Sequence, residues 1–284
     1  MRLTWTAVLA LVLALLAAGC SSDDKKPDDS KSTMGDTKPE KTDVDMREYL
    51  QSTLLVSPWP KESAGLKRGQ WLEIKNASAG KTSTMRIAIV GEEGPNFLVE
   101  ESATVTGGGE GAFLGFIEGL TIEKATGKVV AAVAAKKGEK GKSIKLGPEP
   151  VVQATTPTTA DESVTVAAGT FAATKTVIAG QLSETATWVG KDGDAKGIVL
   201  KEASDDAVLR ELKVLANEDA TIGGKPLKVT HATYSDGSET WFVRGVAVPF
   251  YGTGDTTWVK QSRAGTTTEL AWGEDAKPEI DWAK

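Results

Sequence analysis

Histidine and cysteine are almost absent from this 284-residue chain, which contains one residue of each type. This excludes an intramolecular disulfide and any zinc site built from several histidines. The Gly-x-Ser-x-Gly motif is also missing, so the nucleophile elbow of the α/β-hydrolases is excluded. The single histidine, His231, lies in an extended run and is interpreted as a strand residue packed against Phe242 rather than as a catalytic base.

Motifs for phosphate and calcium are incomplete. The segments 80–82 and 141–143 resemble the end of a phosphate-binding loop, but both have lysine where the motif needs its first glycine. The segment 192–203 begins like a calcium loop, but lysine and alanine occupy its fifth and twelfth positions. Glu100 and Glu101 are adjacent, and neighbours on a strand point to opposite faces, so they cannot share a substrate. No catalytic residue, metal site or cofactor is predicted, and an enzyme is the least favoured class.

A basic surface is lacking as well. The formal net charge is −6, and no segment concentrates lysine and arginine into an obvious patch. Nucleic acids and anionic surfaces attract basic proteins, so a nucleic-acid partner is not expected.

What the chain does contain is a distinctive N-terminus. Arg2 precedes a run from Ala7 to Ala18 made only of Ala, Val and Leu, and this run is too short to span a bilayer, which takes about 20 apolar residues. A charged start, an apolar run and small residues before a cleavage point are typical of a secretory signal peptide, predicted here as residues 1–19.

The end of that signal, Leu16-Ala17-Ala18-Gly19-Cys20, resembles the lipobox of bacterial lipoproteins. The resemblance implies that the Cys20 thiol is joined to diacylglycerol, that cleavage occurs before Cys20 and that its amine then receives a fatty acid such as palmitate. Several acyl chains make a stable membrane anchor, whereas one holds only marginally. In enteric members of the family an aspartate after the cysteine retains the protein in the inner membrane. Ser21 stands there, so we expect an extracytoplasmic protein held at the outer membrane.

The next residues predict a tether. Residues 20–45 contain no aromatic side chain and almost no apolar ones, so they cannot bury enough surface to offset the entropy of ordering. Treated as flexible coil, the segment reaches roughly 25–30 Å.

The remainder, residues 46–284, is predicted as a β-rich globular domain. Short runs rich in β-branched and aromatic residues alternate with glycine turns, which is typical of an antiparallel meander. Prolines in the connection near 147–160 leave open whether the domain is one unit or two subdomains. Helical spacing predicts helices at 46–56 and 205–216, the second capped by Ser204. The segment 136–145 is interpreted as a solvated loop. The predicted strands cover residues 71–74, 84–90, 97–100, 164–166, 171–178, 185–189 and 197–201.

The clearest hairpin signal is Asp236-Gly237, which favours a two-residue type I′ turn. The predicted register leaves apolar side chains on both faces, so each face needs a cover. A helix or a lipophilic ligand in the hollow of a curved sheet would supply one. The register places Tyr234 opposite Glu239, Ala232 opposite Trp241, His231 opposite Phe242 and Val229 opposite Arg244.

An internal echo suggests that hairpins of one kind recur. The segment 183–189 resembles 238–243, and each is followed by a turn and a strand that carries lysine. Trp71, Trp188, Trp241 and Trp258 all fall on predicted strands and are assigned to the core, with a pocket lining as the minority interpretation.

Segments 166–178 and 227–260 resemble extended stretches of the outer-membrane lipoprotein-sorting and lipoprotein-carrier proteins. The resemblance implies a mainly β fold, a curved antiparallel sheet like a half-open barrel with a few short helices, whose hollow receives acyl chains. It carries over no site residue. The first hypothesis is therefore a non-enzymatic envelope lipoprotein that holds a hydrophobic or lipid-like ligand. The alternative is a structural or interaction module that docks a protein partner.

Overall fold

The computed structural model describes residues 53–54, 65–107, 115–148, 156–180, 183–205, 207–250 and 255–282. These residues form a mainly β structure without an α-helix, so the predicted fold class is confirmed and its helices are not. The signal peptide, Cys20 and the tether lie outside the described residues and stay predictions.

The strands fall into two sequential groups, which we call the first half (β2–β7) and the second half (β8–β16). The first group, with the short β1, comprises β1 (Thr53–Leu54), β2 (Trp71–Ser78), β3 (Lys81–Glu93), β4 (Asn96–Thr106), β5 (Ile117–Glu123), β6 (Val129–Ala135) and β7 (Lys142–Leu146). The second comprises β8 (Thr158–Val166), β9 (Gly169–Ala179), β10 (Glu184–Gly190), β11 (Val199–Ser204), β12 (Ala207–Ile222), β13 (Lys225–Tyr234), β14 (Glu239–Arg244), β15 (Thr256–Arg263) and β16 (Thr266–Gly273), with a 3₁₀ turn η2 (Gly193–Ala195).

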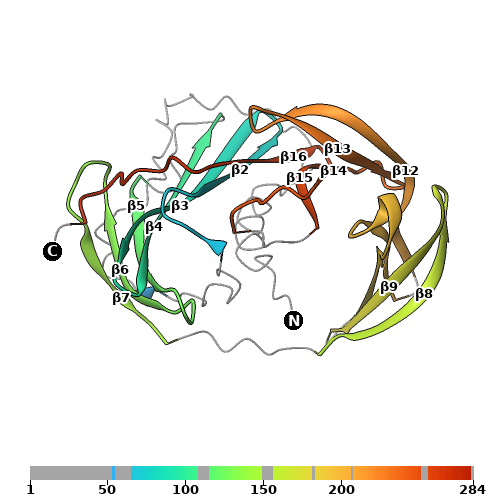
Figure 1. Cartoon of the computed structure of the whole chain (residues 1–284), viewed down its shortest axis with the longest axis horizontal. Helices are drawn as coiled ribbons and strands as arrows, with labels where there is room; N and C mark the ends of the chain where they lie inside the picture. Colours follow the sequence, from blue (N-terminus) through green and yellow to red (C-terminus); the bar gives the residue numbers. More distant parts are fainter. Residues whose placement is uncertain are drawn as a thin grey trace, which may run out of the picture. The chain divides into compact units, whose positions relative to one another are not determined.

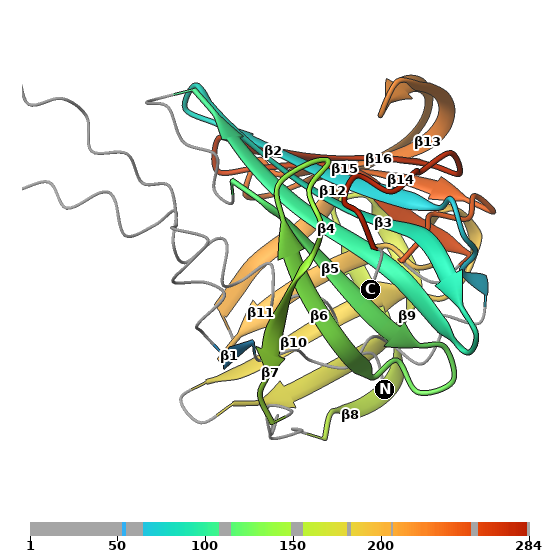
Figure 2. The ribbon, with the colours of Figure 1, turned by 90° about the vertical axis from the view of Figure 1, so that its left-hand side faces the viewer.

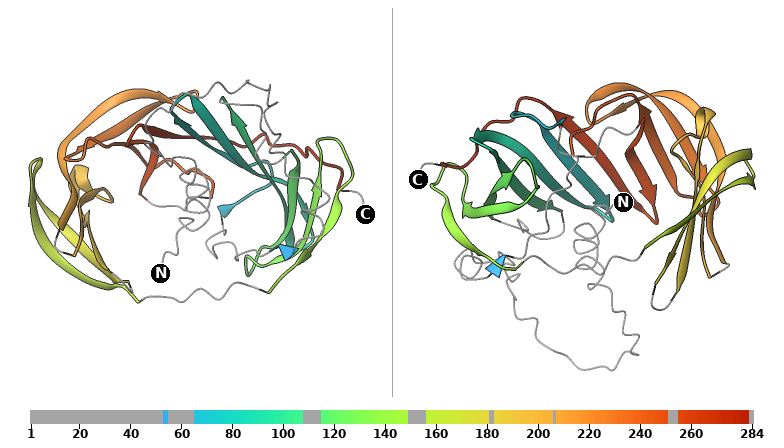
Figure 3. Two further views of the ribbon diagram at one scale, coloured as in Figure 1. Left: turned by 180° about the vertical axis from the view of Figure 1, so that it is seen from behind. Right: turned by 60° about the horizontal axis from the view of Figure 1, so that its bottom comes forward.

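All of these strands belong to one curved, open sheet. Its order is β1-β7-β6-β5-β4-β3-β2-β16-β15-β14-β13-β12-β11-β10-β9-β8, so the chain leaves one edge after β7 and re-enters at the other edge with β8 (Figures 1 and 3). Neighbouring strands are antiparallel except for the parallel pair β1 and β7. Figure 2 shows the meander of the first half side by side from β3 to β7. The two halves meet where β2 pairs with β16.

Tight turns explain why consecutive strands pair. Three hairpins have two-residue loops in which both residues have positive φ, as a type I′ turn requires. Glycine adopts this conformation without strain, and alanine takes the first position in two of the loops. The loops are Ala79-Gly80 (φ 46° and 79°), Gly223-Gly224 (58° and 74°) and Ala264-Gly265 (49° and 75°).

The predicted helix at 205–216 is wrong. Ser204 pairs with Ala207 in a hairpin that turns at Asp205 (φ 45°), and the following residues form β12. Within this strand Arg210 and Leu212 point to the buried face, which is the period of two of a strand. Pairing with β11 and β13 on both sides overrides the local helical spacing.

Two further expectations need correction. At the end of the predicted helix 46–56, Thr53 and Leu54 form β1 and pair with Lys145 and Leu146; the rest of that helix lies outside the described residues. The segment 136–145 is a loop only in its first part, because β7 begins at Lys142 and pairs with β6.

Packed side chains fill one face of the second half. The core includes Trp188, Leu200, Leu212, Tyr234 and Phe242, all at most 8% exposed. It draws on β8 to β14, because the curvature of the sheet brings the turn after β8 to β12, where the Ala168 N–H donates to the Leu212 carbonyl.

In the first half, the C-terminal segment 274–282 lies on the sheet. Ile280 packs against Ile117 of β5 and Ala135 of β6. A Cβ on Gly119 would lie 2.8 Å from the Trp282 side chain, so glycine leaves the room that this segment occupies.

Candidate functional site

The described residues contain no group of three or more His, Cys, Asp or Glu side chains arranged to hold a metal ion. Cys20, the predicted lipidation site, lies outside them. The sites that can be built from the structure are therefore clusters on the strands.

Glu100 and Glu101 point to opposite faces, as the sequence predicts, but neither is a solvated surface carboxylate. Glu100 is 3% exposed and accepts hydrogen bonds from the backbone N–H groups of Glu279 and Ile280 and from the Trp282 indole, at 2.8, 3.2 and 2.9 Å. It therefore fastens the C-terminal segment to the sheet.

Glu101 lies directly opposite Glu118 on the next strand. Burial raises the pKa of Glu101 to about 8, and the negative charge of Glu118 adds to the rise. Sequence reasoning missed this pair because its members are seventeen positions apart and only the register of β4 with β5 brings them together.

The hairpin around Asp236 forms, but its predicted register is wrong by one residue. Thr233 pairs with Glu239 and the loop has three residues, Ser235 to Gly237. The Gly237 N–H donates to the Tyr234 carbonyl and Gly237 has φ 78°, so a type I turn is followed by a glycine bulge. The Asp236 carboxylate accepts from the backbone and hydroxyl of Ser238, which favours this longer loop.

The register decides the environment of His231. It lies opposite Trp241, not Phe242, and its ring stacks on the indole with centroids 4.3 Å apart. Glu218 and Glu239 lie 3.4 and 3.8 Å from its two nitrogens. The predicted packing against Phe242 is therefore wrong, although His231 is a strand residue as expected.

Both faces of this hairpin are nevertheless covered. Tyr234 and Phe242 belong to the second-half core, while Val229 and Val243 on the opposite face are 3% and 1% exposed.

The best candidate for a ligand-binding site is a row of three side chains that runs across β9, β10 and β11. Trp188 lies directly opposite Lys175 on one side and Lys201 on the other. The two ammonium groups are 4.9 and 5.1 Å from the centroid of the indole ring, within the range of cation–π attraction. The Trp188 N–H donates to the Glu162 carboxylate of β8. We call Lys175, Trp188 and Lys201 the lysine rung.

The next rung on the same face is apolar and small. Ala186 lies opposite Val177 and Ala203, and Ala203 lies opposite Val208, which is 50% exposed. Because two small alanines lie next to the large indole, the face of the sheet has a hollow there with a volume of about 200 Å³. We call these four residues the apolar rung. The hollow is lined by Lys175, Glu184, Ala186, Trp188, Lys201, Ala203 and Asp205.

The acidic residues of the hollow lie at its far end. The Asp205 carboxylate accepts the Glu184 backbone N–H at 2.7 Å and so closes the turn region. One end of the hollow thus carries two ammonium groups, its floor contains two alanines, and its other end carries two carboxylates, of which that of Asp205 accepts a backbone N–H.

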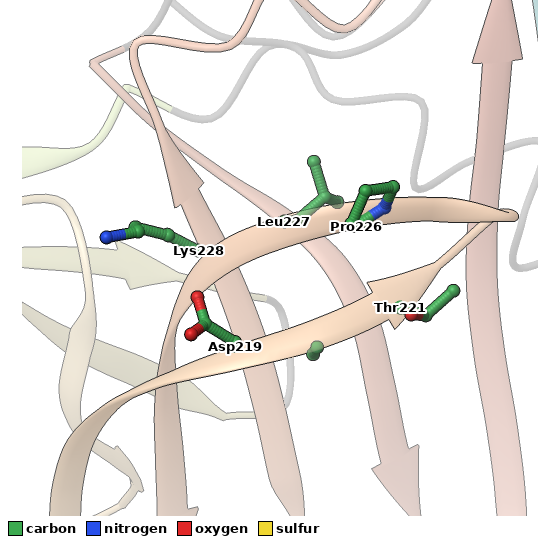
Figure 4. Close-up of a pocket in the computed structure, with 6 residues that line it drawn as sticks. Asp219, Thr221, Pro226, Leu227 and Lys228 are labelled. Atoms are coloured by element: carbon green, nitrogen blue, oxygen red, sulfur yellow. The ribbon is translucent and has the colours of Figure 1, made fainter.

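A second depression, of about 360 Å³, lies beside the β12–β13 hairpin (Figure 4). Its lining consists of consecutive residues on each strand, and consecutive strand residues point to opposite faces, so their side chains cannot converge on one ligand. The lining residues are Asp219, Ala220, Thr221, Pro226, Leu227 and Lys228.

The sequence carried a partial signal for the lysine rung. All four tryptophans highlighted there lie on strands, and Trp188 is buried, whereas Trp71, Trp241 and Trp258 are partly exposed. The echo between 183–189 and 238–243 has a structural counterpart, because Lys260 lies opposite Trp241 with its ammonium group 4.7 Å from the ring, as Lys201 does for Trp188. Lys175 precedes the echo and could not be found from it.

No protein-family model matches this chain, and no curated protein matches it either. A membrane-crossing helix is not found in the part of the chain that the structure describes.

Proposed function

We propose that the protein is a non-enzymatic lipoprotein of the cell envelope, anchored through lipid on Cys20, which binds a hydrophobic or lipid-like ligand on its curved sheet. The observation that carries the proposal is the hollow of about 200 Å³ on the face of the second-half core, where the apolar rung meets the lysine rung. The lining of the hollow combines the Trp188 ring and two alanines with the charged side chains of two lysines, Glu184 and Asp205.

The anchor and the localisation rest on the sequence. The lipobox at residues 16–20 and Ser21 favour an extracytoplasmic protein at the outer membrane, with residues 20–45 as its tether. Growth with an alkyne-bearing fatty acid tests the anchor. The full chain becomes labelled, while Cys20→Ser removes the label and leaves the signal peptide uncut. Labelling that persists in this variant contradicts lipidation at Cys20.

Ligand binding is tested by extracting lipids from the purified full chain and identifying them by mass spectrometry. Ala203→Phe fills the hollow and is expected to abolish the co-purified ligand. Ala131→Phe is the matched control, because Ala131 is an exposed alanine on β6 of the first half. Equal ligand content in the wild type and both variants contradicts binding in the hollow.

The second candidate is a module that docks a protein partner. It is favoured by β8, an edge strand of nine residues whose outer side pairs with no described strand. Such edges add a partner's strand by backbone hydrogen bonding. In-cell cross-linking from Thr159 distinguishes the candidates, since a docking module gives one specific protein adduct and a ligand carrier gives none.

A further inference from the structure

The lysine rung indicates what the ligand of the hollow carries at its polar end; this inference rests on the function proposed above. Lys175 and Lys201 are both half-buried, and both ammonium groups face the Trp188 ring. Among the described residues neither lysine forms an ion pair. Two like charges beside one indole repel each other, and an anion bound next to them would offset that repulsion.

Among the described carboxylates nearby, none forms an ion pair with either lysine, including Glu211, which lies directly opposite Lys201 on β12. Glu162 is engaged by the Trp188 N–H at the edge of the ring. Glu184 and Asp205 lie beyond the apolar rung, and Glu184 is four positions before Trp188 on β10, which corresponds to about 13 Å along the strand. The cationic end of the hollow is therefore open to an acidic group from outside the chain.

The position of the apolar rung fixes how such a ligand would lie. The alanines form the floor directly beside the lysines, and the half-exposed Val208 extends the apolar surface toward solvent. A molecule with an acidic end and an apolar body can satisfy both rungs at once. A neutral lipid would leave the two ammonium groups unpaired, and a small inorganic anion would leave the apolar rung uncovered.

We propose that the hollow binds an anionic amphiphile, with its acidic head group at the ammonium groups that flank Trp188, those of Lys175 and Lys201, and its acyl chain along the apolar rung. A carboxylate and a phosphate monoester share this chemistry, because lysine recognises either as a point charge at the end of a flexible stem.

The experiment uses the full chain in lipid nanodiscs and three photoactivatable probes with the same alkyl chain: palmitic acid, hexadecyl phosphate and hexadecanol. Peptide mapping by mass spectrometry then locates the adducts. The two acids are expected to label peptides covering 175–203 about tenfold more than the alcohol, a ratio equivalent to about 1.4 kcal/mol. Whichever acid labels more strongly identifies the head group.

Paired charge variants test the lysines themselves. Lys175→Gln combined with Lys201→Gln is expected to reduce labelling by the acids to the level of the alcohol. Lys213→Gln combined with Lys228→Gln removes the same charge from exposed lysines on β12 and β13 and should change nothing. Far-ultraviolet circular dichroism of both variants checks that the sheet is retained.

The outcomes separate this inference from the function on which it rests. Labelling at 175–203 by all three probes alike, unchanged in the Lys175/Lys201 variant, overturns the anionic head group but keeps a hydrophobic ligand. Absence of labelling there by any probe overturns both.

Discussion

Glu101 shows how one side chain can make the stability of the sheet depend on pH. It lies opposite Glu118, and burial raises its pKa from 4.5 to about 8. Between these values the folded chain holds a proton that the unfolded chain releases, so stability decreases as pH rises. The contribution of protonated Glu101 to the free energy of unfolding is fully present below about pH 4.5 and is lost by about pH 8.

Glu101→Gln should remove this dependence, because an amide stays neutral at every pH and is similar in shape. We expect the variant to be more stable than the wild type at pH 9 and to lose its advantage toward pH 5. Urea unfolding followed by tryptophan fluorescence across that range measures the difference. Glu139→Gln, an exposed position, is the control. Parallel stability curves for the wild type and Glu101→Gln would contradict the assignment.

Glu100, its neighbour on the opposite face, should behave differently. Its carboxylate accepts three hydrogen bonds from the C-terminal segment, and an amide nitrogen in place of one oxygen would face donors. Glu100→Gln should therefore destabilise the protein by about 1.5–3 kcal/mol. Hydrogen exchange at residues 279–282 should also become faster in the variant. Unchanged exchange there would show that the carboxylate does not hold the segment.

Glu100 and Glu101 show what the sequence alone can and cannot predict about a single side chain. That Glu100 and Glu101 point apart follows from the strand period alone. Their environments do not, because Glu118 and Trp282 come from segments distant in sequence. The lysine rung has the same origin, since two registers place Lys175 and Lys201 beside Trp188.

At the scale of elements, most strands were predictable, and two of the corrections show what a local pattern misses. Strands such as β2 alternate apolar and polar residues between glycine turns, which local pattern reveals. The segment 205–216 has helical spacing, and only pairing with both neighbours makes it a strand. The register of the Asp236 hairpin differs from the predicted one by one residue, because the Asp236 side chain accepts hydrogen bonds from Ser238 and favours a longer loop. A shift of one residue exchanges the faces of every partner.

The turn between β12 and β13 gives a prediction at this scale. Gly223 and Gly224 both have positive φ, but a Cβ on Gly223 would lie 2.5 Å from the Leu270 carbonyl oxygen, whereas one on Gly224 meets nothing within 4 Å. Gly224→Ala should cost about 1 kcal/mol, the strain of its φ alone. Gly223→Ala should cost clearly more, because it also pushes the hairpin off β16. Urea unfolding of both variants measures the difference, and equal losses would contradict the contact.

At the scale of the whole sheet, the order of strands is what no local pattern could show. The connection after β7 carries the chain from one edge to the other, so the first and last long strands, β2 and β16, become neighbours. Prolines near 147–160 marked the connection but not the edge to which it leads. Among the described strands, β2 with β16 is the only pairing that joins the two halves.

The pairing of β2 with β16, which we call the seam, should couple the unfolding of the two halves. Leu270 of β16 is fully buried and lies opposite Ile74 of β2, so Leu270→Ala should cost about 2–5 kcal/mol and weaken the seam. Leu212→Ala is the matched control, since Leu212 is equally buried but lies within the second-half core. Hydrogen exchange in increasing urea should give one midpoint for all strands in the wild type. It should give separate midpoints for β3–β6 and β10–β13 in Leu270→Ala, and a lower but shared midpoint in Leu212→Ala. A shared midpoint in both variants would mean that the halves are coupled through contacts other than the seam, with the C-terminal segment held by Glu100 as the next element to test.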